Sequence, residues 1–118
     1  MSRQALGARG EEYVAGYIQR QRMAVLERNY RCRLGEIDII AKDGDTVAFI
    51  EVKTRSGSRF GSPAEAVTEA KKQKLLKAAY DYIASRDVGD VGLRFDVAEV
   101  FVQDNGFSIN YIKNAFGE

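Results

Sequence analysis

A glutamate and a lysine separated by one residue follow an apolar run in the segment FIEVKTR, residues 49–55. Side chains alternate between the two faces of a strand, so Glu51 and Lys53 share one face. A second carboxylate, Asp38, lies thirteen positions upstream of Glu51 in the segment GEIDIIAK, and the DGD sequence at 43–45 indicates a tight turn between them. The spacing therefore predicts an antiparallel hairpin that carries Asp38, Glu51 and Lys53 on the same face.

The length of the turn decides how the two acids meet. If DG is a two-residue turn, Asp38 lies opposite Phe49 and diagonal to Glu51, whereas a turn two residues longer places Asp38 opposite Glu51. Both registers keep the two acids on one face of the sheet. A one-residue change would instead point Asp38 to the other face, among Ile50 and Val52.

Two carboxylates in such proximity suit a divalent cation. At a separation of about 5 Å they repel each other by roughly 3 kcal/mol at an effective dielectric constant of 20, and Lys53 offsets only part of this. Hard oxygen ligands favour Mg²⁺ or Mn²⁺, which activates water for attack on a phosphate while Lys53 orients the water or neutralises developing charge. The simpler interpretation is a solvent-facing Glu-x-Lys ion pair worth a few tenths of a kcal/mol.

Composition limits the other kinds of chemistry. The 118 residues contain no histidine, which excludes catalytic triads and histidine-based zinc sites. The lone Cys32 forms neither an intramolecular disulfide nor a cysteine zinc cluster, and the N-terminus has no hydrophobic region of the signal-peptide kind, so we expect a cytoplasmic protein. The length predicts one domain over residues 1–118, and no apolar run is long enough to span a membrane.

Positive charge is concentrated in residues 52–77, although the net charge of the whole chain is only +1. Such a segment is typical either of a surface that meets a polyanion or of a solvated helix face. For Arg55 a phosphate contact and plain solvation are equally consistent with the pattern, and Arg59 with Phe60 would contact a nucleic-acid backbone and stack on a base. The basic residues of the segment are Lys53, Arg55, Arg59, Lys71, Lys72, Lys74 and Lys77.

Hydrophobic periodicity and turn signals predict an α/β domain with a mixed sheet. The second helix has a clear start signal, with Ser62 as N-cap, Pro63 at the first helical position and Glu65 completing a capping box. Its inward stripe is expected to contain Val67, Leu75, Ala78, Ala79 and Tyr82. The expected elements are a helix at 4–22, strands at 24–31, 35–42 and 46–54, a helix from 62 to about 85, and strands at 93–102 and 107–113.

These motifs resemble a known group of proteins. Asp38, twelve residues and then Glu51-Val52-Lys53 is similar to the D-(x)n-[DE]-x-K signature of the PD-(D/E)xK nuclease superfamily, with Ile37 in place of the proline. The segments GARGEE, RNYRCRLGEIDIIAKDG, FIEVKTR and RFDV resemble the YraN-like bacterial proteins of uncharacterised function. The resemblance implies a restriction endonuclease-like fold, related to archaeal Holliday-junction resolvases.

The resemblance also implies roles for individual residues. Asp38 and Glu51 match the metal-binding acids, and Lys53 matches the catalytic lysine. The related resolvases use a further glutamate on the first helix, and helical geometry favours Glu11 over Glu12, because Glu11 borders the buried face. Lys71 matches a polar residue that the superfamily often carries on the second helix, where it would reach a phosphate.

Other polar residues have structural interpretations. Glu36 is either an outer metal ligand or, in the favoured interpretation, the partner of Arg33 or Arg55 in an ion pair. Asp96 is expected to form a buried pair with Arg94. The tyrosines at 13, 17, 80 and 82 are expected to fill the edges of the core.

Together these observations predict a Mg²⁺-dependent or Mn²⁺-dependent endonuclease that acts on DNA, with branched or repair intermediates among the candidate substrates and nucleic-acid contacts at Arg55, Arg59, Lys71 and Lys74. The alternative is a nucleic-acid-binding or complex-assembly module that keeps the fold without cleaving. A domain of this size offers limited surface for gripping a duplex, which is consistent with a homodimer, although the sequence shows no dimer seam.

Overall fold

The computed structural model describes residues 2–56, 68–104 and 106–116. In this part of the chain the order is helix, three strands, helix and two strands, as the sequence predicts. The helices are α1 (Arg3–Arg20) and α2 (Glu69–Ser85), and the strands are β1 (Ala24–Cys32), β2 (Gly35–Asp43), β3 (Thr46–Ser56), β4 (Gly92–Gln103) and β5 (Gly106–Phe116).

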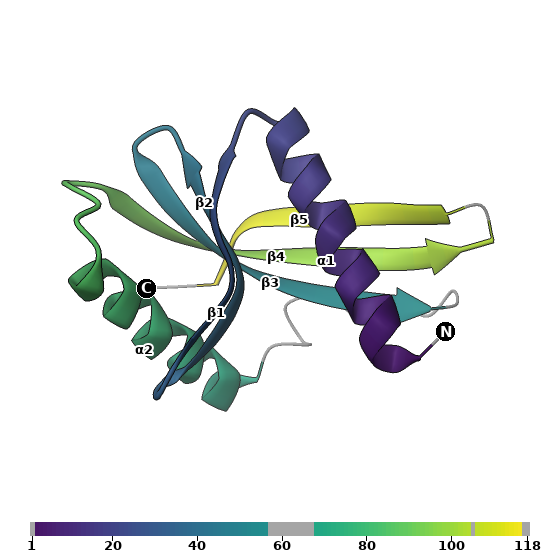
Figure 1. Cartoon of the computed structure of the whole chain (residues 1–118), viewed down its shortest axis with the longest axis horizontal. Helices are drawn as coiled ribbons and strands as arrows, with labels where there is room; N and C mark the ends of the chain where they lie inside the picture. Colours follow the sequence, from purple (N-terminus) through teal and green to yellow (C-terminus); the bar gives the residue numbers. More distant parts are fainter. Residues whose placement is uncertain (1, 57–67, 105, 117–118) are drawn as a thin grey trace.

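The strands form one mixed sheet in the order β1-β2-β3-β4-β5 (Figure 1). β3 and β4 pair in parallel, and the other neighbours pair antiparallel. A parallel pair needs a crossover connection, and α2 lies in the connection between β3 and β4. This arrangement confirms the predicted α/β class and agrees with a restriction endonuclease-like core.

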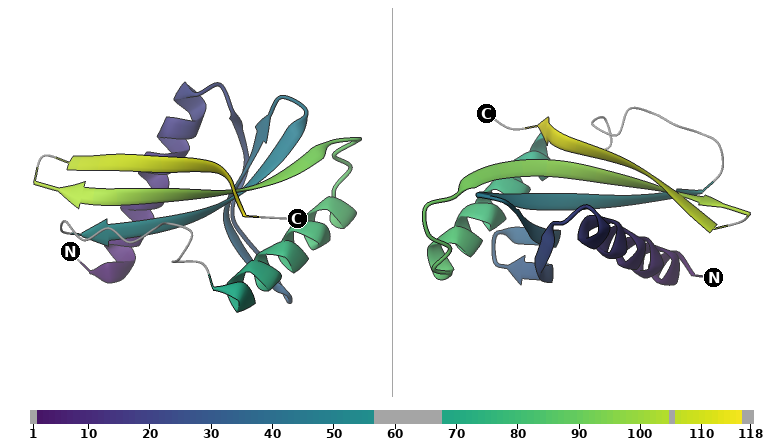
Figure 2. Two further views of the ribbon diagram at one scale, coloured as in Figure 1. Left: turned by 180° about the vertical axis from the view of Figure 1, so that it is seen from behind. Right: turned by 90° about the horizontal axis from the view of Figure 1, so that it is seen from above.

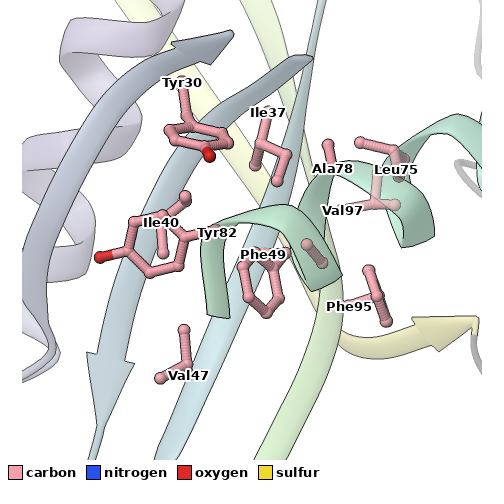
Figure 3. Packing of buried hydrophobic residues seen from close by; sticks show 11 residues of the cluster. Tyr30, Ile37, Ile40, Val47, Phe49, Leu75, Ala78, Tyr82, Phe95 and Val97 are labelled. Carbon is pink, nitrogen blue, oxygen red and sulfur yellow. The ribbon is translucent and has the colours of Figure 1, made fainter. Parts of the chain in front are cut away.

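The helix α2 covers the face of the sheet that carries Phe49 (Figure 3). Its stripe at Leu75, Ala78, Ala79 and Tyr82 is buried, as predicted. The Tyr82 ring packs edge-on against two aromatic neighbours, with its centroid 5.2 Å from that of Tyr30 and 6.1 Å from that of Phe49. The side chains on this face therefore fix α2 across the middle of the sheet.

The helix α1 covers the opposite face (Figure 2). Val14 and Ile18 are fully buried in a cluster with Ala48 and Ile50 of β3. The helix comes so close to β3 at Gly10 that a Cβ there would lie 2.1 Å from Oγ1 of Thr54. Gly10 therefore brings the next residue, Glu11, close to the sheet.

Two details of the second helix differ from the sequence prediction. Thr68 is extended (φ −70°, ψ 164°) and its side chain caps the helix by accepting from the backbone N–H of Lys71, so the helix begins at Glu69 and does not run through Thr68 from Ser62. The predicted cap at 62–65 and Val67 lie outside the described residues. Tyr80, expected at the edge of the core, is 49% exposed.

Among the described residues, neither helix has the length and apolar character that a membrane span requires.

Candidate functional site

The hairpin between β2 and β3 places the two predicted acids face to face. Its two-residue turn is Gly44-Asp45, one position later than the simplest prediction, because Asp43 pairs with Thr46 and Ile39 pairs with Ile50. Gly44 has a φ of +61°, which the turn requires and glycine adopts without strain. Extending this register by one residue sets Asp38 opposite Glu51, which is the second of the two registers that the sequence allowed.

The backbone ladder between β2 and β3 ends just before the acids. The last pair is Ile39 with Ile50. Beyond it, Oδ2 of Asp38 accepts a hydrogen bond from the backbone N–H of Val52 at 2.8 Å. The Asp38 carboxylate therefore lies in the gap where the two strands separate, and its position is set by the backbone of β3.

Glu51 is almost buried, with 8% of its surface exposed. Its pKa is raised from 4.5 to about 7, first by burial and then by the negative charge of Asp38, with which it also forms a side-chain hydrogen bond. Lys71 of α2 opposes the rise through its positive charge, with its Nζ 3.4 Å from Oε1 of Glu51. The carboxyl group of Glu51 therefore takes up a proton near neutral pH when no cation lies between it and Asp38.

Lys53 lies on the same face as Glu51, next to the ammonium group of Lys71. Burial lowers the pKa of Lys53, and the hydrogen bond and positive charge of Lys71 lower it further, while Glu51 and Asp38 act in the opposite direction. The site therefore contains one acid, Glu51, and two amines, Lys53 and Lys71, whose protonation states depend on each other, next to the carboxylate of Asp38.

The first helix contributes Glu11 and not Glu12, as helical geometry predicts. Glu11 is half-buried, and its pKa is raised by burial and by the negative charge of Asp38, while Arg28 and a hydrogen bond from Asn29 oppose the rise. Glu12 is exposed and forms an ion pair with Arg28 at 2.9 Å. Glu11 therefore adds negative charge beside Asp38, from the opposite face of the sheet to Lys71.

The donor set of this site fits a small hard cation. Mg²⁺ typically takes one or two protein carboxylates, keeps several waters and accepts phosphate oxygens, and Asp38 and Glu51 provide two adjacent carboxylates. A cation between them would remove the repulsion that raises the pKa of Glu51. Within the described ranges, no three histidine, cysteine or acidic side chains form a ready ligand cluster, so the predicted third ligand Glu11 does not complete one here.

A pocket of about 640 Å³ opens beside the two acids. One wall is the turn between β1 and β2, and the other is the first part of α2, which lie side by side in Figure 1. The two walls touch at Gly35, where a Cβ would come within 2.9 Å of the backbone carbonyl oxygen of Lys74. The pocket is lined by Arg31, Cys32, Arg33, Leu34, Gly35, Glu36, Asp38, Glu51, Thr68, Ala70, Lys71, Lys74 and Leu75.

The remaining predicted nucleic-acid contacts have different surroundings. Lys71 and Lys74 line the pocket, and Arg59 lies outside the described residues. Arg55 extends to Glu99 of β4, with Nε 2.5 Å from Oε2, in a geometry that does not form an aligned hydrogen bond. Arg55 therefore neutralises a buried carboxylate, and a phosphate contact by the same side chain stays a prediction.

Two acids that the sequence left open are assigned to ion pairs. Glu36 pairs with Arg31 at 3.4 Å and not with Arg33 or Arg55, and both partners are largely exposed. Asp96 is fully buried and pairs with Arg94 through two contacts of 2.9 Å, as predicted. The hydroxyl of Tyr111 also donates to Asp96, at 2.6 Å, so Asp96 belongs to a structural network on β4 and β5.

Sequence reasoning missed three residues that shape the site. Glu99 was assigned no role from the sequence, although it lies on the same face of β4 as Val97 and pairs with Lys53 in the parallel register. Asn29, which donates to Glu11, has a positive φ of 54°, and its asparagine identity in a strand was the available signal. Gly10 gave the same kind of signal, since a glycine inside a helix often marks a close contact.

Comparison with known proteins places the chain in a family. The model of the uncharacterised protein family UPF0102 matches residues 10–100. A UPF0102 protein of Caldicellulosiruptor saccharolyticus is 42% identical over 118 residues, which cover 98% of this chain and 100% of that protein. A UPF0102 protein of Clostridium botulinum is 47% identical over 114 residues, which cover 94% of this chain and 93% of that protein. A UPF0102 protein of Nocardia farcinica is 48% identical over 100 residues, which cover 85% of this chain and 79% of that protein. The predicted resemblance to the YraN-like proteins is confirmed, and the chain belongs to the UPF0102 (YraN) family.

Proposed function

We propose that this protein is a metal-dependent endonuclease that hydrolyses phosphodiester bonds of DNA at the site formed by Asp38, Glu51 and Lys53. One observation carries the proposal. The carboxyl groups of Asp38 and Glu51 are held together in a nearly buried position, and the pKa of Glu51 is raised to about 7. Two adjacent, nearly buried carboxyl groups lower the stability of the folded state, so folding by itself does not account for them. Strongly shifted pKa values also cluster at functional sites.

Asp38 and Glu51 would hold Mg²⁺ or Mn²⁺. Asp38 keeps its orientation through the N–H of Val52 and still has a second oxygen for the ion. Glu11 lies near enough to raise the negative potential around Asp38, which favours a divalent over a monovalent cation. When bound, the ion supplies neutralisation of phosphate charge and activation of water.

Lys53 is the residue that acts on the attacking water and the phosphate. Its lowered pKa leaves more of the amine in the neutral form that can accept a proton than in an ordinary lysine, and its protonated form donates hydrogen bonds to phosphate oxygens. The neighbouring Lys71 partly neutralises Glu51 while no cation lies between the two acids. Once the charge of Glu51 is matched by the ion, Lys71 is free to contact a phosphate at the edge of the pocket.

A second candidate function is nucleic-acid binding without cleavage. It is favoured by the ion pair between Lys71 and Glu51, which already neutralises part of the acid pair, and by the lack of a three-acid cluster in the described residues. Both candidates predict nucleic-acid binding by the pocket, and only the first predicts hydrolysis that depends on Lys53. A homodimer stays a prediction under either function, and sedimentation velocity would measure it.

Cleavage assays separate the two candidates. Labelled single-stranded, duplex and branched DNAs, with matching RNAs, are incubated with Mn²⁺ and wild-type protein, Lys53→Ala or Lys77→Ala. Lys77 is an exposed lysine of α2 outside the pocket lining, so its variant controls for loss of one positive charge. We expect Lys53→Ala to lose at least about 100-fold in rate, in the range of general acid–base and electrostatic effects, and Lys77→Ala to retain activity. Equal cleavage by wild type and Lys53→Ala would identify a contaminant and leave the binding function.

A further inference from the structure

The pocket beside the acid pair differs from an ordinary surface cleft in its charge. Arg31 and Arg33 extend from the turn between β1 and β2, and Lys74 extends from α2 on the other wall. We call these three residues the basic rim. Arg33 and Lys74 are exposed and form no ion pair with any described acid, and Arg31 has only the exposed Glu36 at 3.4 Å. The rim therefore presents positive charge that the described part of the molecule leaves available to a ligand.

The same pocket has an apolar part. Leu34, in the turn between β1 and β2, is 50% exposed and lines the pocket, and the nearly buried Leu75 lines the opposite wall. A half-exposed leucine beside arginines contributes little to the stability of the fold. Sites for unpaired nucleic acid combine cations for phosphates with a surface, usually aromatic, for the flat faces of bases, and in this pocket leucine provides that surface.

The size of the pocket limits what enters it. A volume of about 640 Å³ lies within the roughly 300–1,000 Å³ of pockets that enclose a small ligand, which favours a few unpaired nucleotides over a whole duplex. The contact between Gly35 and the carbonyl of Lys74 joins the two walls, so the pocket cannot widen without moving α2 away from the turn. The acids Asp38 and Glu51 line this pocket. We therefore expect a phosphate that reaches them to belong to a strand that leaves its duplex.

We propose that the pocket binds an unpaired nucleic-acid strand, with the basic rim on its phosphates and Leu34 against a base. This inference rests on the proposed function and specifies its substrate class as single strands or the unpaired part of a partly paired nucleic acid. DNA and RNA share the phosphate and base chemistry that the pocket recognises, and the experiment below separates them.

Binding is measured by fluorescence anisotropy in EDTA, so that no cleavage is required. The ligands are a labelled DNA strand of about 15 nucleotides, the same sequence as RNA, the blunt DNA duplex, and that duplex with an unpaired tail. We expect the strand and the tailed duplex to bind at least about 10-fold more tightly than the blunt duplex. The DNA and RNA arms show which sugar the pocket prefers.

Two double variants with the same change of charge test the location. Arg31→Gln with Arg33→Gln should weaken single-strand binding by about 10-fold and reduce the salt slope by roughly 1.4, since each lost phosphate contact accounts for about 0.7. Arg20→Gln with Arg22→Gln removes two exposed cations at the other end of β1, a nine-residue strand about 25–30 Å long, and should change neither value. Leu34→Ser should weaken binding severalfold with an unchanged salt slope, and circular dichroism checks that each variant is folded.

The outcomes separate this inference from the proposed function. Equal or tighter binding of the blunt duplex, or equal effects of the two arginine pairs, would overturn the unpaired-strand pocket even if the protein cleaves DNA. A strand preference that depends on Arg31 and Arg33 supports the pocket even if no cleavage is found, in which case the nuclease function fails alone. If the arginine variant does not fold, the exposed Leu34→Ser variant gives the decision.

Discussion

Oδ2 of Asp38 accepts a hydrogen bond from the backbone N–H of Val52 at 2.8 Å, at the point where β2 and β3 stop pairing. A side chain here takes the place of a backbone acceptor of the ladder. The carboxylate is therefore fixed in a gap of the sheet, where it faces Glu51 from one strand and the charge of Glu11 from α1. This hydrogen bond therefore holds a negative charge at the point where the two strands separate.

Replacement of Asp38 by asparagine tests whether this charge serves a ligand. The amide oxygen can keep the bond from Val52, while the repulsion with Glu51 disappears. Without metal we expect Asp38→Asn to be as stable as wild type or more stable by about 1 kcal/mol, which is roughly 4 °C in Tm for a chain of this length. Differential scanning fluorimetry in EDTA measures this shift.

The same variant should lose the stabilisation that Mn²⁺ or Mg²⁺ gives to wild type, because a ligand stabilises only the state that binds it. Calcium-free buffer with added K⁺ at equal ionic strength controls for salt effects. A wild type indifferent to both divalent ions, together with an unfolded Asp38→Asn, would make the two acids structural partners.

The pKa of Glu51 predicts how stability depends on pH. Its value is about 7 in the folded protein against 4.5 ordinarily, so the folded state binds more protons between these values. The contribution of Glu51 is therefore complete below about pH 4.5, is lost as the pH rises through 7, and then levels off. We expect metal-free Glu51→Gln to gain on the order of 2 kcal/mol relative to wild type between pH 5 and pH 8, measured by urea unfolding.

Other titrating groups are present in both proteins, so the difference between the two pH profiles isolates Glu51. Saturating Mn²⁺ should reduce that difference, because the ion binds the ionised carboxylates. Parallel profiles for wild type and Glu51→Gln in EDTA would contradict the raised pKa.

Glu11 and Glu12 provide a matched pair on the first helix. Glu11→Gln removes negative charge beside Asp38 and should weaken Mn²⁺ binding by about 10-fold. This is the size of effect expected for residues that interact with the metal ligands. Glu12→Gln breaks only an exposed pair with Arg28 and should change stability by less than about 1 kcal/mol and metal affinity not at all. Isothermal titration calorimetry with Mn²⁺ compares them, and equal losses would remove Glu11 from the site.

Gly10 holds α1 against β3, and its replacement should move the helix. The added Cβ of Gly10→Ala would lie 2.1 Å from Oγ1 of Thr54, and such overpacking destabilises by about 1–3 kcal/mol. Thr54→Ala removes the clashing hydroxyl, so the double variant should be more stable than the sum of the single effects predicts. Gly7→Ala is the control, since a Cβ there meets no atom within 4 Å.

The period-two pattern of the strands was sufficient to predict that Asp38 and Glu51 share a face, and helical geometry was sufficient to choose Glu11 over Glu12. Both are local rules that hold in any context. The exposed position of Tyr80 follows from the same geometry, because it lies about 200° around the helix from the buried Ala78, and the expectation that it fills the core edge neglected this.

Contacts between distant elements could not be predicted in this way. The pairing of Lys71 with Glu51 depends on where α2 crosses the sheet, and the pairing of Arg55 with Glu99 depends on the parallel register of β3 and β4. The predicted start of α2 at Ser62 was wrong, because Ser62 and Thr68 are both suitable N-cap residues and the helix begins after Thr68. Tertiary packing, which the local signal does not contain, decides between such candidates.

The parallel pairing of β3 with β4 also sets an order of folding. The hairpins from β1 to β3 join near neighbours in the chain, whereas Thr46 reaches Gly92 only after the crossover through α2 is closed, and such long-range pairing is slow. We therefore expect Asp38 and Glu51 to come together before Lys71 pairs with Glu51. Refolding in EDTA should then be faster at pH 6 than at pH 8, and Asp38→Asn should abolish the difference in stopped-flow kinetics.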